Sequence, residues 1–287
     1  METRPSYTFE IFPPKYNQSK ASTYAAIDGL AALNPDLISV TYGAGGSSRD
    51  NTIEISSAIQ NKYKIQGVAH LTCVDSSREN ILKILDELKA NNIKNILALR
   101  GDLKDPNDLS KCDFHYAAEL IKFINQERPD DFKILAAGYP DKHPEAASLE
   151  QDLKNLKAKC DLGVSEIITQ LFFDNDEFFK WLDKVRALGI NQPVVAGIMP
   201  VTSASQLERM ASMCGAVIPE RVRRFVDAYR NNSWALKDAG VTYASEQILD
   251  LLARGVDGIH LYTMNQVDIT RRIDENIRSA LYCKRFK

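Results

Sequence analysis

The chain has 287 residues, of which 44% are hydrophobic and 26% are charged, and its formal net charge is −2. This balance is typical of a globular protein and excludes the strongly basic surface of a nucleic-acid-binding protein. No apolar stretch is long enough to span a bilayer, and the start, METRPSYTFE, lacks the pattern of a signal peptide. We therefore expect a cytoplasmic protein with no membrane partner.

The cysteines and histidines are spread along the chain without metal-ligand spacing. Five cysteines make an odd total with no CxxC pair, which favours reduced thiols over a disulfide scaffold. The four histidines are similarly isolated, so we expect no metal site.

Eight short apolar runs predict β-strands, and stretches of helical length such as 77–90, 148–162 and 175–188 lie between most of them. The runs are residues 7–12, 37–43, 65–73, 95–101, 133–139, 166–173, 193–199 and 258–264. Alternating strands and helices predict a parallel sheet, and eight such units predict a closed (β/α)8 TIM barrel of the α/β class. We expect a single domain over residues 1–287, with extra helices between about 203 and 255, before the last strand.

The first run, YTFEIFPPK, carries a carboxylate inside an apolar strand. Alternation puts Thr8, Glu10 and Phe12 on one face, and Pro13 and Pro14 end the strand just past the acid. Taken alone, Glu10 is better explained as a structural ion-pair residue than as a chemical group.

A barrel places its active site at the C-terminal ends of its strands. Polar side chains collect at those ends, and the whole set is poorly explained by chance exposure to water. The set is Glu10, Thr41, Tyr42, His70, Thr72, Arg100, Asp102, Tyr139, His143, Gln170, Tyr262, Thr263 and Asn265. Glu10 then becomes a candidate chemical group.

Three familiar kinds of site, two catalytic and one for a dinucleotide, fit the residues at these strand ends badly. A Schiff-base aldolase needs a lysine there, but Lys64 and Lys133 lie at strand starts. A glycosidase could use Glu10 and Asp102, but no tryptophan platform accompanies them. The stretch GAGGSS, residues 43–48, lacks the third glycine of a dinucleotide fingerprint and fits better as a tight turn close to a ligand.

The helix predicted over 148–162 has two stripes. Leu149, Leu153, Leu156 and Cys160 form its buried face. Asp152, Asn155 and Lys159 lie about a quarter turn away, where they could hold ribose hydroxyls and a pyrophosphate or form a solvated flank.

The motifs FEIFPPK, SVTYGAGGSSRD, AHLTC, ALRGD, AAGYPDKHPEA, ITQLFFDN, GIMP and HLYTMNQ resemble those of methylenetetrahydrofolate reductase, in the same order and over about residues 7–266. The resemblance implies a (β/α)8 barrel that binds FAD without a dinucleotide fingerprint. It also implies a short, bacterial-type form without a C-terminal regulatory domain, acting in one-carbon metabolism and methionine biosynthesis. Relatives of this type are commonly homo-oligomers.

The resemblance also assigns roles. Glu10 matches the general acid that opens 5,10-methylenetetrahydrofolate to its 5-iminium cation, and its apolar neighbours should favour the protonated carboxyl. Asp102 matches an acid near flavin and pterin that would stabilise the cation. Gln170 matches a residue that contacts folate and nicotinamide in turn, which implies a ping-pong cycle with NADH or NADPH.

The remaining matches surround the ligands. The positions around FAD are Thr41, Tyr42, Ala44, His70, Arg100, Gly101, Asp102, Tyr116, Ala117, Tyr139, His143, Ala146, Asp152, Asn155 and Lys159. Asp102, Gln170, Gln206 and Gln266 match substrate-side positions.

Three positions depart from the family pattern. Ala158 stands where relatives often have an arginine near the FAD phosphates, Met210 replaces an aromatic residue, and Gln266 replaces an arginine that can hold the folate tail. The alternatives are a flavin-free pterin-binding barrel of the methyl-transfer kind, a folate-binding protein without a redox role, and a carboxylate-pair hydrolase. No motif in the sequence distinguishes NADH from NADPH.

Overall fold

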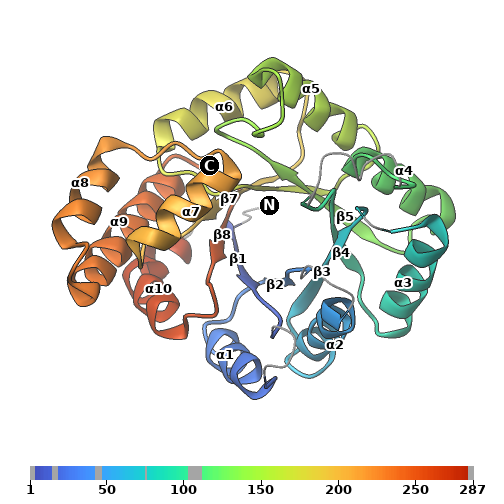
Figure 1. The fold of residues 1–287 in the computed structure, drawn as a ribbon, viewed down its shortest axis with the longest axis horizontal. Coiled ribbons are helices and arrows are strands. Elements are labelled where there is room, and N and C mark those ends of the chain that lie inside the picture. The colour runs from blue at the N-terminus through green and yellow to red at the C-terminus, as the bar shows by residue number, and fades with distance from the viewer. Residues whose placement is uncertain (1–3, 15–18, 43–46, 75, 103–111, 284–287) are drawn as a thin grey trace. The chain divides into compact units, whose positions relative to one another are not determined.

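The computed structural model describes residues 4–14, 19–42, 47–74, 76–102 and 112–283. Helices and strands alternate along the chain in Figure 1, from blue at the N-terminus to red at the C-terminus. The strands are β1 (Ser6–Ile11), β2 (Leu37–Val40), β3 (Gln66–Thr72), β4 (Asn95–Leu99), β5 (Lys133–Gly138), β6 (Glu166–Thr169), β7 (Val194–Ile198) and β8 (Gly258–Tyr262). The helices are α1 (Ala21–Ala31), α2 (Ser47–Asn61), α3 (Arg78–Ala90), α4 (Ala117–Glu127), α5 (Leu149–Cys160), α6 (Asn175–Ala187), α7 (Ala204–Cys214), α8 (Glu220–Tyr229), α9 (Ser233–Ala253) and α10 (Val267–Leu281).

The strands form a closed parallel barrel in chain order, from β1 through β8. The predicted (β/α)8 barrel is therefore confirmed. The extra helices before the last strand are confirmed too, because three helices, α7, α8 and α9, lie between β7 and β8 where the repeat needs one. Strands such as β2 (LISV) and β7 (VVAGI) are buried along their whole length, as expected for a parallel sheet covered on both faces.

Contacts group the chain into two compact units, which are described in turn. The first comprises Glu10–Ala137 and Lys157–Ile167. In it β2, β3, β4 and β5 pair in parallel, with Val68 opposite Asn95 and Asn95 opposite Lys133. Helix α2 packs on β2 and β3, and α4 packs on β4. The prediction of one domain over residues 1–287 stays a prediction.

The second unit comprises Met1–Phe9, Gly138–Leu156 and Ile168–Lys287. Here β7 pairs with β8, and α9 lies beside α10 (Figure 1). A Cβ on Gly240 of α9 would lie 1.8 Å from the Val201 carbonyl oxygen, so only glycine lets this helix cross the chain after β7. Leu207 of α7, Val222 of α8 and Leu236 of α9 share a core with Val201.

Helix ends follow local sequence signals. Ser77, Asp174 and Ser203 cap α3, α6 and α7 by accepting backbone N–H bonds from the first turn. Gly215 ends α7 at φ +71°, in the left-handed region where glycine is favoured. No helix in the part of the chain that the structure describes is long and apolar enough to cross a membrane.

Candidate active site

Glu10 lies near the C-terminal end of β1 and is buried, with 8% of its surface exposed. Its Oε2 lies 3.5 Å from Nε2 of His70 on β3, which is also buried. The structure therefore brings together two predicted site residues that are 60 positions apart. A buried carboxylate beside an imidazole suits a group that holds or moves a proton, and it also satisfies the structural alternative of an ion pair.

The alternation predicted for this strand is supported by the contacts of its neighbours. Tyr7 packs edge-on against Phe9, and burial together with Asp274 of α10 raises the pKa of Tyr7. Thr8, the residue between them, hydrogen-bonds to Nδ1 of His260 at 2.7 Å. Tyr7 and Phe9 thus occupy the opposite face from Thr8 and Glu10.

Three predicted site residues follow β4: Arg100 and Gly101 are half-buried, and Asp102 is exposed. Gly101 has φ +92°, and a Cβ there would lie 3.0 Å from Cβ of Thr72, so this turn requires glycine. The Arg100 carbonyl accepts a bond from the Val74 N–H, which fixes the turn against the end of β3. Asp102 is exposed and is the last residue described before the 103–111 segment.

The loop after β5 is held by its own side chains. Tyr139 and His143 pack ring edge to ring face at 4.6 Å, and the His143 N–H donates to Oδ2 of Asp152 on α5 at 3.0 Å. Nδ1 of His143 accepts a bond from the Glu145 N–H, which leaves the proton of the neutral ring on Nε2. Three predicted FAD positions therefore form one connected group.

Sequence reasoning missed two residues that support this loop. Lys142, at φ +74°, donates through Nζ to the carbonyls of His143 and Ala146. Asp141 accepts a bond from the Val217 N–H, and burial raises the pKa of its carboxyl. The sequence signal was present, because the quoted motif AAGYPDKHPEA contains both residues.

The buried stripe predicted for α5 is confirmed at three of its four positions, and the role of the polar stripe stays a prediction. Leu153, Leu156 and Cys160 are buried, but Leu149 is only half-buried because it begins the helix. Lys159 is half-buried and donates through Nζ to the Ala137 carbonyl on β5 at 2.6 Å. Its charge is therefore held near a strand end.

Asn155 of the polar stripe is followed here by two residues that depart from the family pattern, Ala158 and Met210, and the three differ in exposure. Asn155 is exposed and accepts a bond from Gln151, a contact that a solvated flank also makes. Ala158 is exposed on α5, and Met210 is half-buried against the core beneath α7.

The ends of β6, β7 and β8 are joined by a second set of bonds. The Tyr262 hydroxyl donates to the Thr169 carbonyl at 2.7 Å, and the Gly197 N–H donates to Thr169 Oγ1 at 2.9 Å. A Cβ on Gly197 would lie 2.2 Å from that carbonyl and 2.8 Å from the Tyr262 ring. Gln170 follows, and its Oε1 accepts the Leu171 N–H, so its Nε2 hydrogens are turned away from that amide.

Gln206 and Gln266 are linked through Thr202, which sequence reasoning did not single out. Thr202 Oγ1 donates to Gln206 Oε1 at 3.2 Å and accepts from Gln266 Nε2 at 3.3 Å. Just before Gln266, Met264 and Asn265 both have positive φ, which is a strained conformation for residues other than glycine.

The remaining predicted positions are less constrained. Thr41 and Tyr42 are half-buried after β2, and the Thr41 N–H donates to the Ile11 carbonyl. Tyr116 is 61% exposed and precedes Ala117, the first residue of α4. Ala44 lies outside the described residues.

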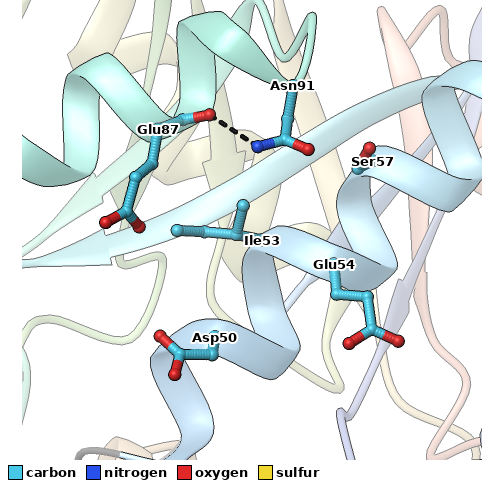
Figure 2. A pocket seen from close by; sticks show the side chains of 6 residues that line it. All are labelled: Asp50, Ile53, Glu54, Ser57, Glu87 and Asn91. Carbon is cyan, nitrogen blue, oxygen red and sulfur yellow. Dashed lines mark hydrogen bonds between the residues drawn. The ribbon is translucent and has the colours of Figure 1, made fainter.

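Neither a metal-binding cluster nor the groove between α2 and α3 adds a candidate catalytic site among the described residues. No cluster of three or more His, Cys, Asp or Glu side chains that could hold a metal ion occurs among the described residues. A groove of about 370 Å³ between α2 and α3 (Figure 2) is lined by Asp50, Ile53, Glu54, Ser57, Glu87 and Asn91. It is formed by helix side chains rather than by strand ends, and three of its six lining residues are acidic.

The family model for methylenetetrahydrofolate reductase matches residues 1–278 of this chain. The chain belongs to the methylenetetrahydrofolate reductase family. It is 36% identical to the 5,10-methylenetetrahydrofolate reductase of Pectobacterium carotovorum subsp. carotovorum over 95% of this chain and 90% of that protein. It is 34% identical to the Escherichia coli (strain K12) enzyme over 93% of this chain and 88% of that protein.

Plant members of the methylenetetrahydrofolate reductase family are longer. Methylenetetrahydrofolate reductase (NADH) 1 of Arabidopsis thaliana is 36% identical over 91% of this chain but only 46% of its own length. The chain thus spans about half of the plant proteins and most of the bacterial ones.

Solved structures support the fold alone, because their sequence identities are low. A protein from Clostridium thermocellum that binds two copies of 5-methyl-5,6,7,8-tetrahydrofolic acid matches at a TM-score of 0.65, with 14% identity over 96% of this chain and 97% of that one. Dihydropteroate synthase from Xanthomonas albilineans, in complex with 7,8-dihydropteroate, matches at 0.53, with 13% identity over 99% of this chain and 95% of that one.

Proposed function

We propose that this chain reduces 5,10-methylenetetrahydrofolate to 5-methyltetrahydrofolate, with FAD as its cofactor and NADH or NADPH as electron donor, in a ping-pong cycle. The observation that carries the proposal is the buried Glu10–His70 pair at the end of β1 and β3, in a chain of this family. A carboxyl group at this place is suited to donate a proton to the substrate as its ring opens to the 5-iminium cation.

The residues present fit FAD. A dinucleotide carries two phosphates, and Lys159 keeps an ammonium group near the end of β5. Gly101, at φ +92°, lets the backbone turn tightly at the end of β4, against Thr72 and next to the predicted cofactor positions Arg100 and Asp102. When bound, FAD would supply a redox centre that takes a hydride from the nicotinamide and gives it to the folate.

The chain's own groups would divide the other tasks. Asp102 would place a negative charge beside the cationic folate, which stabilises the 5-iminium. Gln170 would direct its Nε2 donors to whichever substrate is bound, because its Oε1 is used by Leu171. Since the same side chain would serve folate and nicotinamide, the two would bind alternately.

The proposed location is the cytoplasm. None of the five cysteines, all of which lie among the described residues, forms a disulfide, and burial raises the pKa of Cys73 to about 12, so this thiol stays protonated at neutral pH. Free thiols are the rule in a reducing compartment.

The test uses purified protein under anaerobic conditions. We expect bound FAD, bleaching of its visible absorbance by NADH or NADPH, and return of the absorbance when methylenetetrahydrofolate is added. Protein that binds a folate but carries no flavin would instead support the flavin-free alternative. Flavin that bleaches but is not reoxidised by the folate would contradict the proposed substrate.

A further inference from the structure

Thr202 lies between the two substrate-side glutamines and is buried. It follows β7 by four residues, and its neighbour Val201 is covered by the backbone of α9 at Gly240. The chain before Thr202 is therefore held against α9, and Ser203, directly after it, caps α7.

Both glutamines are also fixed through their backbones. The Gln206 N–H donates to the Ser203 hydroxyl that caps α7. The Gln266 N–H donates to the Thr263 carbonyl at 2.8 Å, and its own carbonyl accepts the Thr270 hydroxyl at 2.9 Å. What remains adjustable is the rotation of each side-chain amide, which decides whether oxygen or nitrogen faces a given partner.

One hydroxyl group controls both rotations. A threonine hydroxyl has a single proton, so it can donate to only one of two amides and must accept from the other. The structure has Thr202 donating to Gln206 Oε1 and accepting from Gln266 Nε2. Gln206 is left with its Nε2 donors and Gln266 with its Oε1 acceptor, and both residues are half-buried.

We propose that Thr202 is a positioning residue that holds Gln206 and Gln266 in opposite amide orientations, so that together they offer one donor and one acceptor to an amide-like edge of the folate. The proposal rests on the proposed function. A folate carries such an edge in the lactam of its pterin and in its benzoyl–glutamate amide. The carboxamide of nicotinamide has the same chemistry, and the two half-reactions distinguish these sources.

The experiment compares Thr202→Val, which keeps the shape and removes the hydroxyl, with Thr202→Ser, which keeps the hydroxyl. In Thr202→Val we expect the Kd for 5-methyltetrahydrofolate, measured by calorimetry on the oxidised holoenzyme, to rise about tenfold, as does the KM for methylenetetrahydrofolate. The kcat and the rate of flavin bleaching by NADH should stay within about twofold, and Thr202→Ser should bind folate within about twofold of the parent.

A second comparison tests whether the hydroxyl acts through the glutamines. In a Gln206→Ala/Gln266→Ala background, adding Thr202→Val should weaken folate binding by no more than about twofold, because nothing remains to be oriented. A full tenfold effect in that background would overturn the proposal.

The other outcomes are equally decisive. Unchanged folate binding in Thr202→Val, or equal weakening in the Val and Ser variants, would overturn the role of the hydroxyl. Slower bleaching by NADH with intact folate binding would overturn the assignment to folate. A parent protein whose flavin is not reduced by NADH and that does not bind 5-methyltetrahydrofolate would overturn the proposed function itself. An active parent whose folate binding is equalled by Thr202→Val would overturn only the role of Thr202.

Discussion

Replacing Glu10 by glutamine should slow the reduction of methylenetetrahydrofolate and spare the reduction of the flavin. Only the folate requires a proton from the protein for its ring to open, whereas hydride transfer from NADH to flavin requires none at this position. Loss of a general acid typically costs 10²–10⁴-fold in rate, or about 3–5 kcal/mol of barrier. The flavin step should stay within a few-fold.

The structure indicates that this substitution leaves the fold intact. Glutamine has nearly the shape of glutamate, so it fills the same buried volume between β1 and β3. Its amide can remain within reach of Nε2 of His70, 3.5 Å from the present carboxylate oxygen. We therefore expect a change of no more than about 1 kcal/mol in the free energy of unfolding.

Anaerobic stopped-flow spectroscopy measures the two half-reactions separately through the flavin absorbance. Glu79→Gln is a matched control, because it removes one carboxylate from the exposed Glu79–Lys83 pair on α3 and should alter neither step. Equal slowing of both steps by Glu10→Gln would mean that Glu10 organises the site rather than donating a proton. An unaffected folate step would remove Glu10 from the mechanism.

Three further predictions test other parts of the structure. Lys159→Ala should weaken FAD binding about 10- to 100-fold by loss of a charged hydrogen bond, whereas Lys157→Ala on the same helix should not. Equal losses of FAD from the two variants in a flavin-release titration would contradict the role of Lys159 in holding FAD. Tyr262→Phe should lower the free energy of unfolding by about 0.5–1.5 kcal/mol in urea, because the Thr169 carbonyl loses its donor, and an unchanged midpoint would refute this. Burial raises the pKa of Asp141 above its ordinary 3.8, so its charge destabilises the folded state and the free energy of unfolding falls as pH rises from about 4. Asp141→Asn should therefore be more stable than the parent near pH 7 and lose that advantage near pH 4, and a constant difference between urea midpoints across this range would contradict the burial effect.

The sequence alone determined the elements of this fold. Hydrophobic periodicity and turn residues act over a few positions, so the strand that ends just before Pro13 and Pro14 and the helix over 175–188 can be predicted from local sequence. Eight alternating strand–helix units then predicted the barrel, and the barrel predicted an active site at the strand ends, where Glu10 and Asp102 lie.

Only the tertiary structure decided which side chains meet. Glu10 and His70 lie on strands that are not adjacent in the barrel, and Thr202 and Gln266 are 64 residues apart, so no local pattern could pair them. No sequence motif marks Thr202 as a functional residue. The partners of its hydroxyl are the donors and acceptors that the fold brings within about 3 Å of it. The sequence alone predicted candidate groups at the strand ends, whereas the hydrogen bonds of Gln206 and Gln266 to Thr202 could be seen only in the fold.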